Sequence, residues 1–254
     1  MQNVLPEVLK GDRESGVSIC EIHGEYNSTW LHVGRWSRCP ECERISKEKR
    51  EAEMLKVESR ERTVKAINGS LIPPRYKTKS FDNYIAPNNS PAARSRDSLA
   101  DYATMFGENI KNGSSAVLLG KCGTGKTHLA AAVGNYILNN GYTVKYMTMY
   151  DAVGKFKETF NNRDISEESV LKVFADPDLL IIDEAGVGFG STSEEIFMYR
   201  MINRRYEQMK PTMVCANLTI EEFSDKIGER VLDRLMEGGG PVLVFDWDSY
   251  RMKG

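Results

Sequence analysis

The sequence lacks any long apolar run. Its apolar stretches, such as residues 116–119 and 179–182, are far shorter than the roughly 20 residues that a helix needs to cross a bilayer. The first residues, MQNVLPEVLKGDRE, also lack the apolar core of a signal peptide. These absences argue against a membrane-spanning protein and predict a soluble protein of the cytoplasm.

A basic excess is missing as well. The chain has 254 residues and carries 34 lysines and arginines against 36 aspartates and glutamates, a formal net charge of −2. Proteins that bind duplex DNA constitutively usually carry a clear positive excess. We therefore expect any contact with nucleic acid to be local or conditional.

Cysteine is scarce and unevenly spread, and an odd count of five argues against a disulfide framework and favours a metal cluster. Cys20-x-x-His23 and Cys39-x-x-Cys42 each place two ligands at a spacing that can grip one ion. Four nitrogen and sulfur ligands suit tetrahedral Zn²⁺. His32 is a poorer substitute for His23, and the bland alternative is a set of reduced cysteines in an irregular segment.

The composition changes abruptly after the cysteines. Residues 43–68 alternate acids and bases around a thin apolar stripe, which predicts an exposed helix. It is either a solvated connecting helix or a helix that binds a partner or pairs with itself. We predict three parts: a zinc-binding domain at 1–45, a charged helical linker at 46–68 and a main domain at 69–254.

From residue 92 onward, expected strands alternate with expected helices. Strands are predicted at 116–119, 143–148, 179–183, 212–216 and 242–245. The longer helices are predicted at 92–112, 127–139, 150–160, 166–175, 192–208 and 228–236. This alternation is typical of an α/β fold, with a parallel sheet that helices cover on both faces.

A glycine-rich segment between a predicted strand and a predicted helix fits the pattern G-x-x-x-x-G-K-[ST]. Its glycines let backbone N–H groups curl around a β-phosphate, and the helix N-terminus adds positive potential. Lys126 would reach the β- and γ-phosphates, and Thr127 would offer its hydroxyl to Mg²⁺. We predict Mg-ATP binding; the alternative is a generic glycine turn. The loop consists of Gly120, Lys121, Cys122, Gly123, Thr124, Gly125, Lys126 and Thr127.

Polar residues also follow two other predicted strands. Asp183 and Glu184 end the apolar run LLIIDE, where Asp183 would hold Mg²⁺ and Glu184 would activate the attacking water as a general base. Asn217 follows VCA and would contact the γ-phosphate or the water, unless it only caps a turn. Arg230 and Arg234 share one helix face, and either could project into a neighbour's ATP site. Their alternative is a surface helix that Glu229 and Asp233 stabilise by salt bridges.

Residues 72–254 resemble the DnaC-type replicative helicase loaders in the strings GKCGTGKTHLAAAVGN, LLIIDEAGV, IGERVLDRL and FDWDSYR. The resemblance implies an AAA+ ATPase with a P-loop parallel sheet and flanking helices. By motif, His128 joins the nucleotide-binding residues, and Asn217 is the sensor 1 residue. Arg234 is the arginine finger with Arg230 beside it, and Arg251 is the sensor 2 arginine. Few residues follow the last predicted strand, so we expect no C-terminal helical lid and an Arg251 that acts from a short tail.

The resemblance also implies partners. A loader of this kind binds a DnaB-type hexameric helicase, assembles on it as an open ring or spiral, and places it on single-stranded DNA, with slow, regulated ATP hydrolysis. The helical pair at 150–175 lies where such loaders carry an inserted element facing the DNA. Lys157 and Phe160 are the candidate contacts there, and an ordinary core contact is the alternative for Phe160. Some loaders of the family use a zinc-binding N-terminal domain to contact the helicase.

Two other functions remain open at this point. Transposition helpers of the IstB type share much of the same pattern, with a transposase as partner. A zinc adaptor with a degenerate nucleotide site is a non-enzymatic alternative, which the intact Lys126, Thr127, Asp183 and Glu184 argue against.

Overall fold

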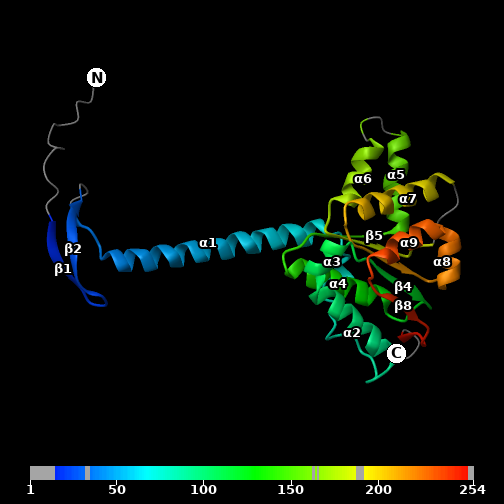
Figure 1. Ribbon diagram of the computed structural model, residues 1–254, viewed down its shortest axis with the longest axis horizontal. Coiled ribbons are helices and arrows are strands. Elements are labelled where there is room, and N and C mark those ends of the chain that lie inside the picture. The colour runs from blue at the N-terminus through cyan, green and yellow to red at the C-terminus, as the bar shows by residue number, and fades with distance from the viewer. Residues whose placement is uncertain (1–14, 32–34, 162–163, 165, 187–191, 251–254) are drawn as a thin grey trace. The chain divides into compact units, whose positions relative to one another are not determined.

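A computed structural model describes residues 15–31, 35–161, 164, 166–186 and 192–250 (Figure 1). The chain divides into two compact units, residues 1–61 and 62–254, and the boundary falls within the predicted linker helix. No helix in the described ranges combines the length and the apolar character that a membrane span requires.

The N-terminal unit is built on a small antiparallel sheet that was not among the predicted elements. Strands β1 (Ser15–Cys20), β2 (Gly24–Leu31) and β3 (Arg35–Trp36) lie in the order β1-β2-β3. Trp30 pairs with Trp36 across β2 and β3, and their rings meet edge to face at 5.4 Å between centroids. Both rings stay about two-fifths exposed, so they partly cover this thin sheet without being buried in it.

The predicted charged helix is present as α1 (Pro40–Gly69). Pro40 occupies its first position, where a missing N–H costs nothing. Arg44 forms ion pairs with Glu41 and Glu48, one turn away on either side. Such i,i+3 and i,i+4 pairs support a helix that has little apolar surface to bury.

The second unit contains the predicted parallel sheet, whose five strands lie in the order β5-β6-β7-β4-β8. The strands are β4 (Ala116–Gly120), β5 (Val144–Thr148), β6 (Leu179–Asp183), β7 (Thr212–Ala216) and β8 (Val242–Phe245). The helices are α2 (Pro91–Thr104), α3 (Phe106–Asn112), α4 (Lys126–Asn139), α5 (Met149–Asn161), α6 (Glu167–Ala175), α7 (Thr192–Glu207), α8 (Ile220–Ile227) and α9 (Glu229–Glu237), with a short 3-10 turn, η2 (Pro74–Tyr76).

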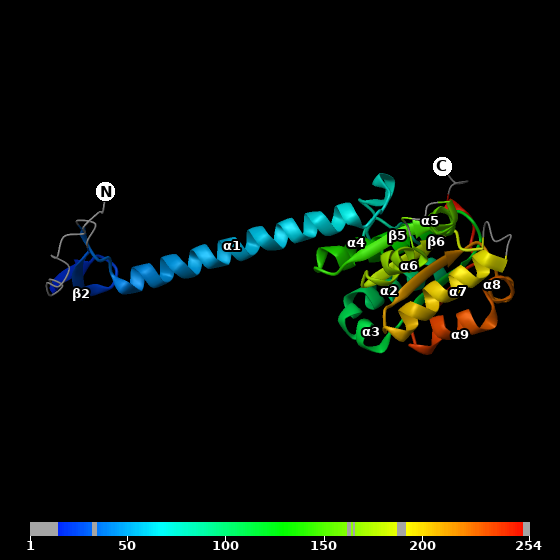
Figure 2. The ribbon, with the colours of Figure 1, turned by 90° about the horizontal axis from the view of Figure 1, so that it is seen from above.

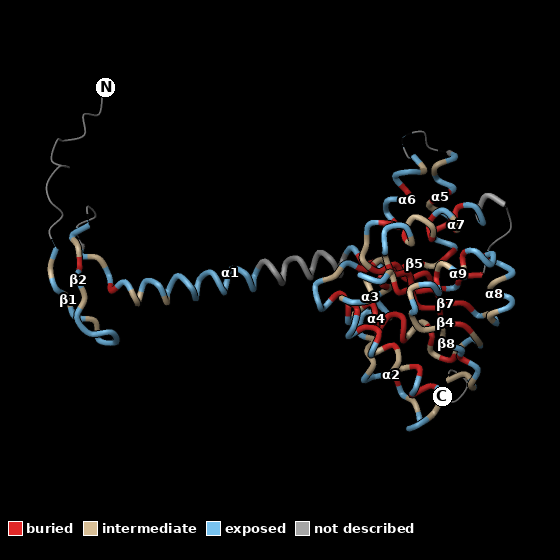
Figure 3. Tube along the Cα trace, viewed as in Figure 1, coloured by how far each residue is buried: buried red, intermediate tan, exposed pale blue. Residues whose placement is uncertain are grey.

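The sheet separates two apolar cores. Val117 and Leu119 of β4 face the core that α5 to α9 cover, whereas Ala116 and Leu118 face the core under α2, α3 and α4 (Figure 2). Buried residues gather in the strands and in the helix faces that lie against them (Figure 3). Both faces of the sheet are therefore covered, which is why its strands read as continuous apolar runs.

One predicted element was wrong in detail. The helix expected at 92–112 is two helices, α2 and α3, that meet at Met105. The break turns the chain so that the Phe106 ring enters the core, where it contacts the rings of Tyr102 and Tyr142 at 6.2 and 5.1 Å. Phe106 is only 1% exposed, so its burial compensates for the interrupted helix.

A buried arginine stabilises the amino-terminal end of the sheet, which is the end opposite the phosphate loop. Arg205 of α7 is fully buried and donates hydrogen bonds to carbonyls of residues 174, 175, 177, 178 and 211 and to Thr212 Oγ1. Burial lowers the pKa of its guanidinium to about 9. Because every donor direction is used, this buried cation stays satisfied without a carboxylate partner.

Candidate nucleotide-binding and metal-binding sites

The phosphate loop lies where the sequence predicted it, between β4 and α4. Gly120, Gly123 and Gly125 all adopt positive φ angles, of 122°, 76° and 99°. A Cβ atom on Gly125 would lie 2.5 Å from Cε2 of Tyr84, so no larger residue fits there. The glycines are thus required both by backbone conformation and by close packing.

Lys126 curls back over this loop. Its Nζ donates hydrogen bonds to the carbonyl oxygens of Gly120, at 2.8 Å, and Lys121, at 2.6 Å. The side chain is 6% exposed, and burial lowers the pKa of its ammonium group, against smaller opposing effects of nearby acidic groups. A buried cation held only by neutral carbonyls is well placed to exchange them for phosphate oxygens.

Thr127 and Asp183 meet at the base of the loop. Thr127 Oγ1 donates to Asp183 Oδ2 at 2.8 Å, and the backbone N–H of Glu184 donates to Oδ1 at 2.9 Å. Asp183 ends the interior strand β6 and is only 6% exposed. A hydroxyl and a carboxylate in contact are oxygen ligands of the kind that Mg²⁺ prefers, so these residues fit the predicted metal.

Glu184 and Asn217 lie at the carboxyl ends of two neighbouring strands, β6 and β7. Glu184 adopts a positive φ of 55°, an unusual conformation for a residue with a side chain, and both residues are exposed. Asn217 directly follows β7, which neighbours β6 in the sheet. The structure therefore brings four predicted polar residues, from the ends of two strands and the start of one helix, to one place: Thr127, Asp183, Glu184 and Asn217.

These residues line a cavity of about 570 Å³, within the usual size of small-molecule sites. Much of the cavity wall comes from the segment before α2, which carries none of the predicted site residues. That wall includes Arg75, Lys79 and Tyr84, and no local motif marks them. The full lining is Arg75, Tyr76, Lys79, Asn83, Tyr84, Ile85, Cys122, Gly123, Gly125, Lys126, Thr127, His128, Asp183, Glu184, Cys215, Ala216, Asn217 and Tyr250.

The predicted His128 also lines the cavity. Its Nε2 donates to the carbonyl oxygen of Ser80 at 3.1 Å, and its ring meets the ring of Tyr84 edge to face. Burial, which exceeds the effect of the Ser80 bond, lowers the pKa of the imidazole. His128 is therefore a neutral group that holds the segment before α2 against α4.

Two aromatic side chains fix the loop from outside. The Tyr84 hydroxyl and the Trp247 indole N–H each donate to the carbonyl oxygen of Thr124, both at 3.0 Å. The backbone N–H of Tyr250 donates to the carbonyl of Gly123 at 3.0 Å. The segment after β8 is thus held against the phosphate loop. Arg251, the predicted sensor 2 residue, is next in the chain and lies outside the described residues.

The two predicted arginines of α9 do not line the cavity of their own chain. The Arg234 guanidinium lies over the Tyr199 ring, 4.7 Å from its centroid, and 5.6 Å from that of Tyr206, both on α7. Its Nη1 is buried and has no hydrogen-bond partner among the described residues. Arg230 is exposed. Among the described residues, neither arginine forms an ion pair with Glu229 or Asp233. Cation–π contacts with Tyr199 and Tyr206 hold Arg234 in place of the alternative salt bridges.

Lys157 and Phe160 lie on α5, which packs with α6 as the predicted helical pair. Phe160 is 63% exposed, and its ring also contacts Phe156 edge to face at 5.0 Å. Phe156 in turn stacks on Phe197 of α7. Phe160 is therefore a largely exposed aromatic ring that contacts the core through Phe156, and Lys157 is exposed one turn before it.

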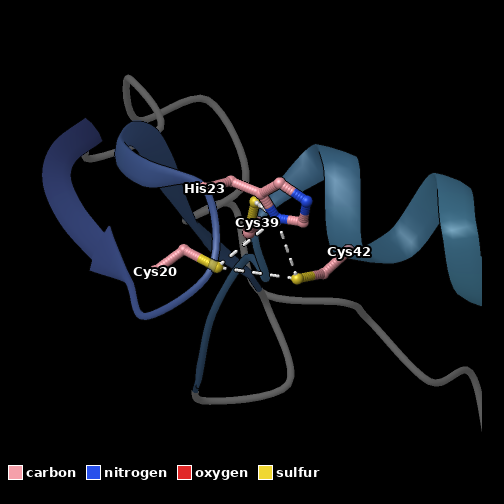
Figure 4. A group of neighbouring side chains, drawn as sticks. All are labelled: Cys20, His23, Cys39 and Cys42. Atoms are coloured by element: carbon pink, nitrogen blue, oxygen red, sulfur yellow. Dashed lines mark hydrogen bonds between the residues drawn. The ribbon is translucent and has the colours of Figure 1, made fainter.

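The four predicted zinc ligands of the N-terminal unit do come together (Figure 4). Cys20 ends β1, His23 follows in the turn before β2, and Cys39 and Cys42 lie at the start of α1. Their ligand atoms all lie within 4.8 Å of one another. The alternative ligand, His32, lies outside the described residues.

The distances in this cluster suit one tetrahedral ion. At the usual bond lengths, tetrahedral Zn²⁺ separates two sulfurs by about 3.8 Å and a sulfur from a nitrogen by about 3.6 Å. Here the Sγ atoms of Cys20 and Cys42 are 3.6 Å apart, and His23 Nδ1 lies 3.3 to 3.7 Å from the three sulfurs. Backbone N–H groups of residues 22 and 23 lower the pKa of the Cys20 thiol to about 6, whereas the hydrogen bond with Cys20 raises the pKa of the Cys42 thiol to about 11. Without metal, the pair therefore favours a single thiolate, at Cys20. The cluster is compatible with a zinc site.

Comparison with known proteins decides the family. Residues 45–254 match the family described as IstB-like ATP binding protein. The chain belongs to this family. Its relatives include the replicative helicase loader DnaC of Escherichia coli strain K12, with 37% identity over 190 residues that span 74% of this chain and 76% of that protein. The replicative helicase loader DnaC of Buchnera aphidicola subsp. Baizongia pistaciae is 37% identical over 70% of this chain and 71% of that protein.

Solved structures agree on the fold of this member of the IstB-like family. The DnaC helicase loader has a TM-score of 0.60 at 22% identity, covering 68% of this chain and 99% of that chain. The replication initiator DnaA, bound to AMPPCP and single-stranded DNA, has a TM-score of 0.59 at 21% identity, covering 72% and 54%. The predicted resemblance to DnaC-type loaders and the α/β AAA+ fold are therefore confirmed.

Proposed function

We propose that this chain is an ATP-dependent loader that binds a DnaB-type hexameric helicase and places it on single-stranded DNA. The observation that carries the proposal is the 37% identity, over three quarters of each chain, to a protein named as a replicative helicase loader. The complete phosphate loop, with Asp183 and Glu184 beside it in one cavity, supports an ATP-driven device over a passive zinc adaptor.

For the chemistry, we propose hydrolysis by in-line attack of water on the γ-phosphate of ATP. Lys126 would leave its carbonyl partners for the β- and γ-phosphates, and Glu184 would accept a proton from the water. Asn217 would orient the γ-phosphate or the water. Thr127 and Asp183 would hold Mg²⁺, which neutralises charge on the phosphates. Hydrolysis in such a switch is expected to be slow and governed by the partner and DNA.

We further propose that the site is completed by a neighbouring copy in an open ring or spiral on the helicase. Arg234 is the proposed finger, because it lies on α9 outside the cavity of its own chain and its buried Nη1 has no hydrogen-bond partner among the described residues. A finger supplied by a neighbour stabilises the charge of the transition state. Arg230, exposed beside it, and Arg251 are proposed as further nucleotide contacts.

The N-terminal unit is proposed to bind zinc through Cys20, His23, Cys39 and Cys42 and to contact the helicase. We retain the division into a zinc-binding domain at 1–45, a helical linker at 46–68 and an ATPase domain at 69–254 as part of this proposal. Support comes from the ligand distances and from the small sheet, which buries too little to fold on packing alone.

For single-stranded DNA, we propose contacts from α5. Phe160 offers a supported, largely exposed ring on which a base could stack, and Lys157 lies on the same helix for a phosphate. A Phe160→Ala chain that binds a single-stranded oligonucleotide as tightly as the parent would remove this part of the proposal. Tyr150→Ala, which removes another exposed aromatic ring of α5, is the matched control.

A transposition helper is the second candidate, and the family description favours it, because IstB-like proteins give the family its name. The two functions differ in the partner. We expect the tagged chain with ATP to retain the replicative helicase of its host and not an IS21-type transposase offered at equal concentration. Retention of the transposase alone would reverse the choice.

A further inference from the structure

A tyrosine outside every recognised motif touches the proposed magnesium site. Tyr146 lies on β5, the edge strand that pairs with β6, and it is only 3% exposed. Its hydroxyl donates to Asp183 Oδ2 at 2.6 Å. In the β5–β6 register, Tyr146 is opposite Ile181, so Asp183 lies two residues further along β6 on the same face of the sheet.

The Asp183 carboxylate accepts hydrogen bonds from three donors, and they are not equivalent. Oδ2 accepts from Thr127 and Tyr146, and Oδ1 accepts from the backbone N–H of Glu184. The proposed role of Thr127 requires its hydroxyl oxygen to face Mg²⁺. The Tyr146 hydroxyl is then the side-chain donor that can stay hydrogen-bonded to Asp183 Oδ2 both without and with bound Mg²⁺.

We propose that Tyr146 is a positioning residue that orients Asp183 toward the bound metal. This inference rests on the proposed Mg-ATP site. Partners that hydrogen-bond a metal-facing carboxylate fix its orientation, and their loss typically costs about 10-fold or more in metal affinity.

The surroundings of Tyr146 hold its ring in place for this role. Its backbone N–H donates to the carbonyl of Ser70 at 2.7 Å, and the Tyr76 ring lies 6.4 Å from its own. An ordinary phenol is protonated at neutral pH, so the hydroxyl can serve as the donor to Asp183 Oδ2.

The test removes this one hydroxyl and compares it with an equivalent hydroxyl elsewhere. Tyr146→Phe is matched by Tyr102→Phe, because Tyr102 is 5% exposed and its hydroxyl donates to the Ser114 carbonyl, away from the cavity. In the full chain, a fluorescent ATP analogue is titrated with Mg²⁺ and, separately, bound in EDTA. Thermal melting of both variants measures the common cost of losing a buried hydroxyl.

Tyr146→Phe is expected to need about 10-fold more Mg²⁺ for half-maximal response while binding the analogue in EDTA like the parent. Tyr102→Phe should match the parent in both measurements, even if it melts earlier. An unchanged Mg²⁺ requirement in Tyr146→Phe, or an equal change in both variants, would overturn the inference while leaving the nucleotide site intact. A parent chain that binds no nucleotide would instead overturn the proposed function, and the inference with it.

Discussion

Glu184→Gln should bind Mg-ATP like the parent chain and hydrolyse it at least about 100-fold more slowly. The substitution keeps the shape of the side chain but removes the carboxylate that would accept the proton of the attacking water. Glu184 is exposed in the cavity and its backbone N–H already bonds to Asp183, so the change should leave the fold intact. Phosphate release with helicase and single-stranded DNA present measures the rate.

Arg234→Ala should slow ATP hydrolysis by a comparable or larger factor under the same conditions, since an arginine finger accelerates the reaction about 10³- to 10⁵-fold. The decisive version of this experiment mixes the two variants. A Glu184→Gln copy keeps its finger, and an Arg234→Ala copy keeps its general base, so a mixed assembly contains complete sites at their shared boundary. Mixing should restore hydrolysis well above the level of either variant alone.

The controls separate the two assignments. Glu221→Gln changes an exposed glutamate of α8 that does not line the cavity, and it should hydrolyse ATP like the parent. A Glu184→Gln chain with the parental rate would show that another group activates the water. A mixture as inactive as its components would contradict a finger that acts between copies.

Removing the metal should unfold the N-terminal unit and leave the ATPase unit folded. Zinc binding is worth about 10 to 16 kcal/mol in zinc-finger peptides, far more than the few buried residues of this sheet can supply. The parent should contain close to one zinc per chain, and Cys39→Ser combined with Cys42→Ser should contain none. Metal analysis measures the zinc, and limited proteolysis should then cut within residues 15–45 while fragments of the second unit survive.

Cys122→Ser provides the matched cysteine control for metal content. Cys122 is exposed in the phosphate loop, outside the cluster, so its loss should leave the zinc in place. A parent chain without zinc, or a double variant that keeps it, would contradict the ligand assignment.

The elements that sequence predicted well are those with local signals. The glycine loop and the strand that ends in Asp183 each depend on neighbouring residues, and the structure has both. Strand β7 coincides with the predicted 212–216 because its run is apolar and bounded by polar residues.

The parts that sequence missed depend on contacts between distant segments. Periodicity continues through Met105, and only the burial of Phe106 shows why the helix breaks there. In the sequence, Tyr84 looks like an ordinary loop residue, and only the fold shows its contact with the phosphate loop. Tyr146 likewise looks like an ordinary strand residue, and only the strand register shows that it lies beside Asp183. The N-terminal strands were not predicted, because their alternation of buried and exposed residues is short and the core they cover is small.

The most direct measurement of the central claim is the amount of replicative helicase retained on a closed circle of single-stranded DNA. A closed hexameric ring cannot thread onto a circle unless it is opened, and a high-salt wash removes helicase that is bound only to the outside by charge. The account predicts that salt-resistant helicase accumulates on the circle only when this chain and ATP are both present. Equal retention with and without the chain would contradict it.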